Sequence, residues 1–178
     1  MRMKGMENVW ITCFASIDLK NVTIKLKDGA AAELEVKIGE GNLTYTEKVN
    51  RDYTLDRGLL DDVRDGDEAP MDVRMDFLWE YIKGSPESDS LPTIEDVLKR
   101  QGAASAWVST DADACRPFCV DIELTNLPTP TGCGDQEVIT LPDFRYEQLD
   151  HDLRAASVSC TGKCNAKVAT VVRTSTST

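Results

Sequence analysis

A strict alternation of apolar and polar residues constrains this sequence more than any other feature. It is clearest in residues 71–82, where Met, Val, Met, Phe, Trp and Tyr occupy every second position. The same period of two occurs in residues 21–27 and 33–38, which flank the turn signal Asp28-Gly29. Successive side chains of a β-strand point to opposite faces, so each segment predicts a strand with one buried face. The first two strands predict a hairpin.

Further segments with strand character are residues 43–49, 120–124, 137–141, 155–160 and 166–172, with a hairpin turn predicted at Thr161-Gly162-Lys163. Residues 92–102 predict the single helix, because Thr93 and Asp96 form a capping-box pattern and Gly102 is a typical helix end. The expected fold is mainly β: a β-sandwich or partly closed barrel with one short flanking α-helix and a long acidic loop between strands. We expect one domain at residues 21–172, between an N-terminal segment at 1–20 and a frayed tail at 173–178.

Negative charge is concentrated in one part of the chain. The 178 residues carry 20 Lys and Arg against 31 Asp and Glu, a net charge of −11. Residues 52–80 hold ten acidic residues and three Arg, which accounts for −7 of that total. Binding to DNA or RNA through phosphates needs clustered basic residues, so nucleic acid is excluded as an electrostatically bound ligand.

The centre of this acidic segment shows turn formers and no strand period. Residues 51–70 therefore predict a long loop, which is uncommon in a compact domain unless the loop has a function or a partner orders it. A calcium loop is a weaker interpretation: Asp61, Asp65, Gly66 and Asp72 have suitable spacing, but Val63 stands at a ligand position and strands flank the segment.

Catalytic motifs are missing from the sequence, and we expect no enzymatic activity. The single histidine, His151, lies between Asp150 and Asp152, which is typical of a solvated turn. There is no Gly-rich phosphate loop, no Gly-x-Ser-x-Gly motif and no His-Glu-x-x-His motif. No run of about 18 apolar residues is present either, so no membrane-spanning helix is expected.

The cysteines are the strongest chemical signal. Five of the six lie in the last 64 residues. The N-terminus only loosely imitates a secretory signal, so we expect synthesis in a reducing cytoplasm. Three interpretations stay open: zinc ligands, disulfides within or between subunits, and reduced thiols with no special role. Zinc is the only candidate cofactor, and none is otherwise expected. The candidates are Cys115, Cys119, Cys133, Cys160 and Cys164.

Three stretches carry a family resemblance. Residues 39–48 (GEGNLTYTEK) and 56–73 (DRGLLDDVRDGDEAPMDV), followed by 139–163, resemble the tail tube (major tail) proteins of long-tailed bacteriophages. The resemblance covers residues 21–172, although the cysteine-rich C-terminal part is not general to that family. It implies a structural virion protein whose subunits form stacked hexameric rings, with an inner channel through which DNA passes at ejection.

The resemblance also implies partners and site residues. The partners are copies of the same chain and other tail proteins, with DNA as a passing cargo and no membrane. The protein is then located in the virion tail and assembled in the host cytoplasm. Other ring-forming virion parts (tail terminator, baseplate hub, head decoration protein) and a zinc-stabilised cytoplasmic binding module remain alternatives. Channel-lining candidates are Glu47, Asp72, Asp76 and Glu80. Candidates for contacts between subunits are Arg51, Asp56, Arg57, Asp61, Asp62, Arg64, Asp65, Asp67 and Glu68.

Overall fold

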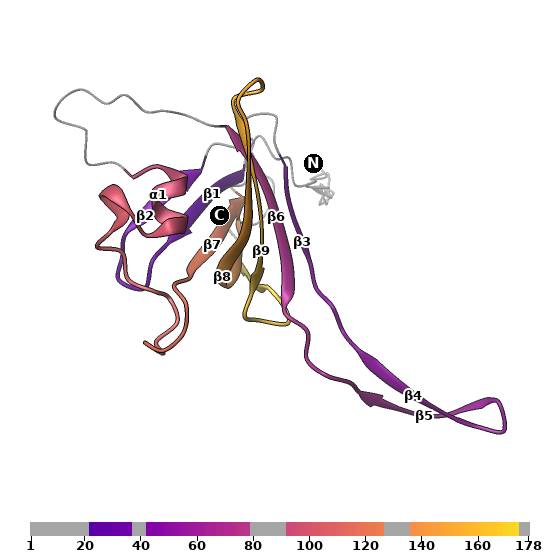
Figure 1. Cartoon of the computed structure of the whole chain (residues 1–178). Coiled ribbons are helices and arrows are strands. Elements are labelled where there is room, and N and C mark those ends of the chain that lie inside the picture. The colour runs from indigo at the N-terminus through magenta and orange to yellow at the C-terminus, as the bar shows by residue number, and fades with distance from the viewer. Residues whose placement is uncertain (1–21, 37–41, 79–91, 127–135, 175–178) are drawn as a thin grey trace, which may run out of the picture.

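The computed structural model describes residues 22–36, 42–78, 92–126 and 136–174, and these residues form a mainly β fold. Ten strands, one α-helix and one 3-10 helix are present in this part of the chain (Figure 1). Their bounds are β1 Val22–Lys27, β2 Glu33–Val36, β3 Leu43–Thr46, β4 Arg51–Asp56, β5 Leu59–Asp65, β6 Met71–Leu78, α1 Ile94–Lys99, η2 Gly102–Ala104, β7 Val120–Asn126, β8 Gln136–Asp152, β9 Ser157–Cys164 and β10 Thr170–Thr174.

Eight strands form one antiparallel sheet in the order β2-β1-β7-β8-β9-β6-β3, and β10 pairs with β8 outside this path. The predicted hairpin is confirmed, because β1 pairs with β2 around a turn at Asp28. Within the described residues the sheet does not close into a barrel, since β2 and β3 lie at its two ends. The other two strands, β4 and β5, form a separate two-stranded sheet.

Strand β8 joins the two halves of the large sheet. Its first half pairs with β7 through Ile122–Leu141 and with β10 through Val171–Ile139. Its second half pairs with β9 through Leu149–Cys160. One 17-residue strand thus holds three neighbours that are far apart in sequence.

A single core fills the inner side of the sheet. Every second residue of β6 (Met71, Val73, Met75 and Phe77) is buried, as the alternation predicts. The same core includes residues of β1, β7, β8 and β9, together with Val97 and Leu98 of α1. Because strands from both halves of the large sheet share one core, the fold is sandwich-like, although the two-stranded sheet of β4 and β5 contributes no residue to that core.

The predicted helix is confirmed as α1. The Thr93 hydroxyl accepts from the Asp96 backbone N–H, and the Asp96 carboxylate accepts from the Thr93 N–H, which completes the capping box. The helix ends at Arg100, which is in the left-handed region, and Gly102 begins η2 instead. No described helix is long and apolar enough to cross a membrane.

Two predicted turns are wrong. Thr161-Gly162-Lys163 lies inside β9, where Gly162 is required by packing: a Cβ there would meet the Arg145 carbonyl oxygen at 2.2 Å and the Phe144 ring at 2.7 Å. Asp150 to Asp152 likewise form the end of β8, not a solvated turn. At the C-terminus, β10 continues to Thr174, so the frayed tail cannot begin at residue 173.

Candidate functional site

The acidic segment folds into an arm, defined here as β4, β5 and their connecting turn. This corrects the prediction of an unstructured loop at residues 51–70. Arg57 and Gly58 form the turn with φ of 51° and 83°, the positive values that a tight two-residue hairpin needs. The arm projects away from the rest of the molecule (Figure 1), and every residue of both strands is exposed.

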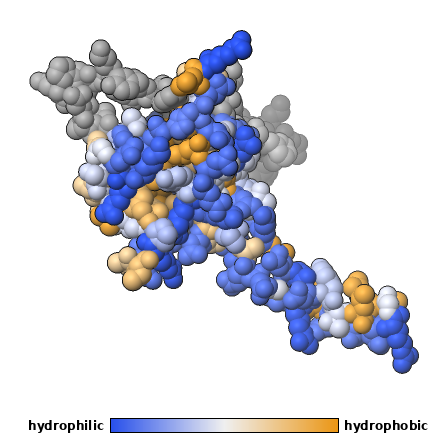
Figure 2. Space-filling model, in the orientation of Figure 1, coloured by the Kyte–Doolittle hydropathy of each residue, from blue (hydrophilic) through white to orange (hydrophobic). Residues whose placement is uncertain are grey.

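One face of the arm is apolar. Directly opposed residues of an antiparallel pair share a face, and the register opposes Tyr53 to Val63 and Leu55 to Leu60. We call these four residues the apolar stripe; their exposed fractions are 62%, 53%, 59% and 74%. Figure 2 shows apolar residues on the far part of the arm among hydrophilic neighbours.

The other face of the arm is mostly polar. It presents Asp52 opposite Arg64 and Thr54 opposite Asp62, and next to the turn it presents Asp56 opposite the exposed Leu59. The two faces were hidden in the sequence because the register shifts between Thr54 and Leu55, which places one extra residue in β5. A search for alternation that allowed one such bulge would have detected the stripe.

The predicted inter-subunit residues all belong to the arm or to the segment that follows it. Arg51 forms an ion pair with Asp65, and Arg64 forms one with Asp62 at 2.9 Å. Asp61 and Asp65 lie in β5 while Asp72 lies in β6, so they do not share a calcium-binding loop. The remaining members, Asp56, Arg57, Asp67 and Glu68, lie at the tip and on the segment that returns to the body.

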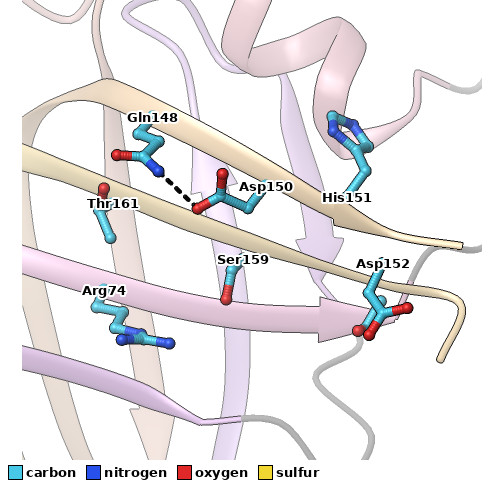
Figure 3. Close-up of a pocket in the computed structure, with 8 residues that line it drawn as sticks. Arg74, Gln148, Asp150, His151, Asp152, Ser159 and Thr161 are labelled. Carbon is cyan, nitrogen blue, oxygen red and sulfur yellow. Dashed lines mark hydrogen bonds between the residues drawn. The ribbon is translucent and has the colours of Figure 1, made fainter. Parts of the chain in front are cut away.

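A broad polar face covers the outer side of the large sheet, opposite the core. It is formed by the outward residues of β6, β8 and β9, including Asp72, Asp76, Asp150, Ser159 and Thr161. Part of this face is hollowed, with a volume of about 450 Å³. Figure 3 shows side chains that line the hollow. Within it, Gln148 Nε2 donates to Asp150 Oδ2 at 2.7 Å. The outward hydroxyls of β9 (Ser157, Ser159 and Thr161) also lie on this face and were not among the channel-lining candidates.

Basic groups on the polar face stand next to carboxylates. Arg74 lies 3.7 Å from Asp76, and Lys163 lies 3.2 Å from Glu147. Lys48 forms an ion pair with Asp72 at the edge of the face. The face therefore offers hydroxyls, amides and acids, while its described cations are already paired.

The channel-lining candidates are separated by the structure. Asp72 and Asp76 both lie on the polar face. Glu47 lies at the base of the arm instead, where its carboxylate accepts a hydrogen bond of 2.8 Å from the Ala169 backbone N–H. Glu80 falls outside the described residues.

His151 belongs to the core side of β8 and contacts the helix. Its Nε2 lies 2.5 Å from Glu95 Oε1, and Glu95 also accepts from Lys99 Nζ at 2.9 Å. The Lys99 hydrogen bond, helped by His151, holds the pKa of Glu95 below its ordinary value. This contact ties α1 to the end of β8.

Three of the candidate cysteines are buried. Cys160 and Cys164 lie on one face of β9, and four residues of strand span about 13 Å, beyond the roughly 7 Å that a disulfide allows. Burial raises the pKa of both thiols to about 12. The Sγ of Cys119 accepts from the Asp111 backbone N–H at 3.3 Å and lies 3.2 Å from the hydroxyls of Ser109 and Thr110.

Cys115 is exposed, and Cys133 falls outside the described residues. In the part of the chain that the structure describes, no three His, Cys, Asp or Glu residues are grouped so that they could hold a metal ion.

Comparison with known proteins gives similarity at the level of fold. No protein-family model and no curated protein sequence matches the chain. One similar chain belongs to the cryo-EM structure of an extracellular contractile injection system, the PVC sheath/tube terminator in its extended state. The two chains are 8% identical with a TM-score of 0.53, over 89% of this chain and 98% of that chain.

A second similar chain comes from the anti-feeding prophage (AFP) baseplate, 6-fold symmetrised. It is 11% identical with a TM-score of 0.42, over 90% of this chain and 96% of that chain. That score is too low to support an argument. The first similarity shows that the present chain has a fold found in a contractile injection system.

Proposed function

We propose that the protein is a non-enzymatic structural subunit of a phage-tail-like tube. Its copies assemble into hexameric rings, the rings stack, and the channel conducts DNA at ejection. The fold shared with a chain of the sheath/tube terminator supports a place in such an assembly. The amphipathic arm carries the proposal.

The arm is difficult to explain in an isolated molecule. A two-stranded ribbon is marginally stable in water, and here its four apolar stripe residues are more than half exposed. Full burial of an aliphatic or aromatic side chain contributes about 1.5–3 kcal/mol, so covering the exposed part of these four side chains would offset some of the entropy cost of association. A second copy of the chain is the proposed occupant, because repeated head-to-tail contacts between copies generate rings and stacks.

Open sheet edges support the same assembly. β2 and β3 end the large sheet, so each has one backbone edge that no described strand pairs. Unpaired edges promote association with other strands, and a closed ring of subunits removes them.

The polar face is the proposed wall of the channel. Its carboxylates, including Asp72, Asp76 and Asp150, would repel DNA phosphates at short range. Its described cations are paired with acids, so they would attract phosphate weakly. DNA is then a passing cargo. Other tail proteins are further partners, the site of action is the virion tail, and assembly takes place in the host cytoplasm without a membrane.

Electron microscopy of concentrated purified protein tests the proposal. We expect rings and stacked tubes from the unmodified chain. Leu55→Asn combined with Leu60→Asn should abolish them, because these substitutions remove half of the apolar stripe. Thr54→Asn, on the polar face of the same arm, is the matched control and should assemble normally. Monomers at all concentrations, or tubes that tolerate the double substitution, would contradict the proposal.

A tube terminator is the second candidate function, and the source of the similar solved chain favours it. A terminator forms one ring and stops, whereas a tube subunit continues to polymerise, so the length of the assemblies separates the two. A baseplate hub ring or head decoration protein would likewise not form long tubes. A monomeric sedimentation profile with stoichiometric zinc would instead favour a zinc-stabilised binding module.

A further inference from the structure

The base of the arm is attached to one loop of the body. This loop, residues 165–169 between β9 and β10, is called the bracket here. The Glu47 carboxylate, on the segment that enters the arm, accepts from the Ala169 backbone N–H at 2.8 Å. Glu68, on the segment that leaves the arm, forms an ion pair with Lys167. Both sides of the arm base therefore contact the same five residues.

The bracket is itself held against the large sheet. The Met71 backbone N–H donates to the Ala166 carbonyl at 3.0 Å, and the Asn165 N–H donates to the Asp143 carbonyl at 3.4 Å. Its two ends continue directly into β9 and β10. The bracket is thus a fixed support, to which the arm is joined mainly by side chains.

The two sides of the arm base are also joined to each other. The Gly66 backbone N–H donates to the Asn50 carbonyl at 3.0 Å, and Asn50 Nδ2 donates to the Asp67 carbonyl at 2.8 Å. These bonds make the base move as one piece, so a restraint on either side restrains the whole arm. Apart from the bracket contacts and the Lys48–Asp72 ion pair, no described hydrogen bond or ion pair joins residues 47–70 to the rest of the chain.

We infer that the bracket sets the direction of the arm, and that Glu47 and Lys167 are positioning residues for assembly. The use of that direction in assembly rests on the proposed function; the restraint itself does not. Exposed ion pairs contribute little to the stability of the folded chain. Direction matters more than stability here, because the arm extends about eight residues or roughly 26 Å beyond its base, and a rotation of about 10° moves its tip by ~5 Å. Such a displacement would separate the apolar stripe from a site on a neighbouring copy.

Distance measurement in the dilute subunit tests the inference without any need for assembly. Spin labels are placed on the exposed Cys115 and on the arm tip through Arg57→Cys, with Cys13→Ser and Cys133→Ser in the background. Double electron–electron resonance then gives the distribution of distances between arm and body. We expect a narrow distribution, which Glu47→Ala combined with Lys167→Ala at least doubles in width without a change in the unfolding temperature.

Three further variants test whether the broadening comes from loss of the bracket contacts. Glu47→Gln should keep the narrow distribution, because its amide oxygen still accepts from the Ala169 N–H. Lys167→Glu alone should broaden the distance distribution, because it places two acids next to each other. The charge exchange Glu68→Lys with Lys167→Glu restores the ion pair and should restore the narrow distribution. Lys25→Ala breaks the Lys25–Glu33 ion pair between β1 and β2, at the opposite end of the large sheet from β6 and β3, and is the matched control. An unchanged width in the Glu47→Ala, Lys167→Ala variant would overturn the inference, even if the unmodified protein assembles into tubes. If the Glu47→Ala, Lys167→Ala variant doubles the width but the unmodified chain never forms rings, the role of the bracket in directing the arm is supported and the proposed function is contradicted.

Discussion

Individual cysteines differ sharply in their surroundings. Cys160 and Cys164 are fully buried within β9, and burial raises the pKa of both thiols to about 12. Cys119 is buried as well, whereas Cys115 is exposed. Since the thiolate is the reactive form, burial and a raised pKa together protect a thiol from alkylation.

We therefore predict that iodoacetamide modifies Cys115 in the native protein and leaves Cys119, Cys160 and Cys164 unmodified until the chain unfolds. Peptide mass spectrometry after short labelling measures this directly. Labelling of Cys160 at the rate of Cys115 would show that β9 is not part of a stable core.

Two aspartates should respond to pH in opposite directions. Burial raises the pKa of Asp121, so its contribution to stability is present below the unfolded pKa near 3.9 and is lost as pH rises through the folded value. Asp121→Asn should raise the unfolding temperature at pH 7, because the amide removes a partly buried charge and keeps an acceptor for the Asp143 N–H. The gain should shrink at pH 3.

Asp111 provides the matched comparison. The Asp113 backbone N–H, together with Arg145 and Arg116, lowers the pKa of Asp111, so its contribution is present above the unfolded pKa and is lost as pH falls through the folded value. Asp111→Asn should lower the unfolding temperature at pH 7 and converge with the unmodified protein at low pH. Thermal unfolding of both variants at pH 3, 5 and 7 measures these trends; the same sign for both at pH 7 would refute them.

Among the secondary-structure elements, β9 can pack against β8 only because Gly162 has no side chain. The Phe144 ring and the Arg145 carbonyl occupy the space that a Cβ of Gly162 would need. We predict that Gly162→Ala destabilises the protein by about 3 kcal/mol, at the upper end of the usual cost of overpacking. Urea unfolding measures this value, with Thr161→Ala on the outer face of the same strand as the control. Equal stability of the two variants would mean that β8 and β9 shift apart without cost.

The same glycine explains one limit of prediction from sequence. Alternation identified β1, β2 and β6 because one face of each strand lies on the core, and the capping box identified α1. Gly162 was assigned to a turn because a close approach between strands is invisible in a single sequence. The arm was assigned to a loop because neither of its faces touches the core and a bulge interrupts the alternation. Of the residues in the candidate site, Asp72 and Asp76 were predicted from the sequence. The apolar stripe could be recognised only once the pairing register of β4 and β5 was known.

For the whole molecule, the cysteine pattern leads to a prediction about assembly. A disulfide between Cys160 and Cys164 is excluded by their separation along β9, which leaves exposed Cys115 as the described thiol available for contact with another chain. We predict that disulfides are absent from freshly expressed protein and appear after assembly in an oxidising medium. Non-reducing electrophoresis measures the disulfide-linked species. Cys115→Ser should remove the disulfides that Cys115 forms between subunits. Stoichiometric zinc that resists dialysis would contradict the prediction.

The central position of β8 has a consequence for the order of events during synthesis. Chains emerge from the ribosome N-terminus first, so β1, β6 and the arm are made well before β8. Ile24 must pair with Leu124, and Met75 with Cys160, before the core can close. Contacts between such distant residues slow folding, whereas the arm pairs only neighbouring residues and can form within microseconds. Like the β1–β2 hairpin, the arm can therefore pair its strands before the core closes. Its pairing stays marginal and its apolar stripe stays exposed to water until the body orients it.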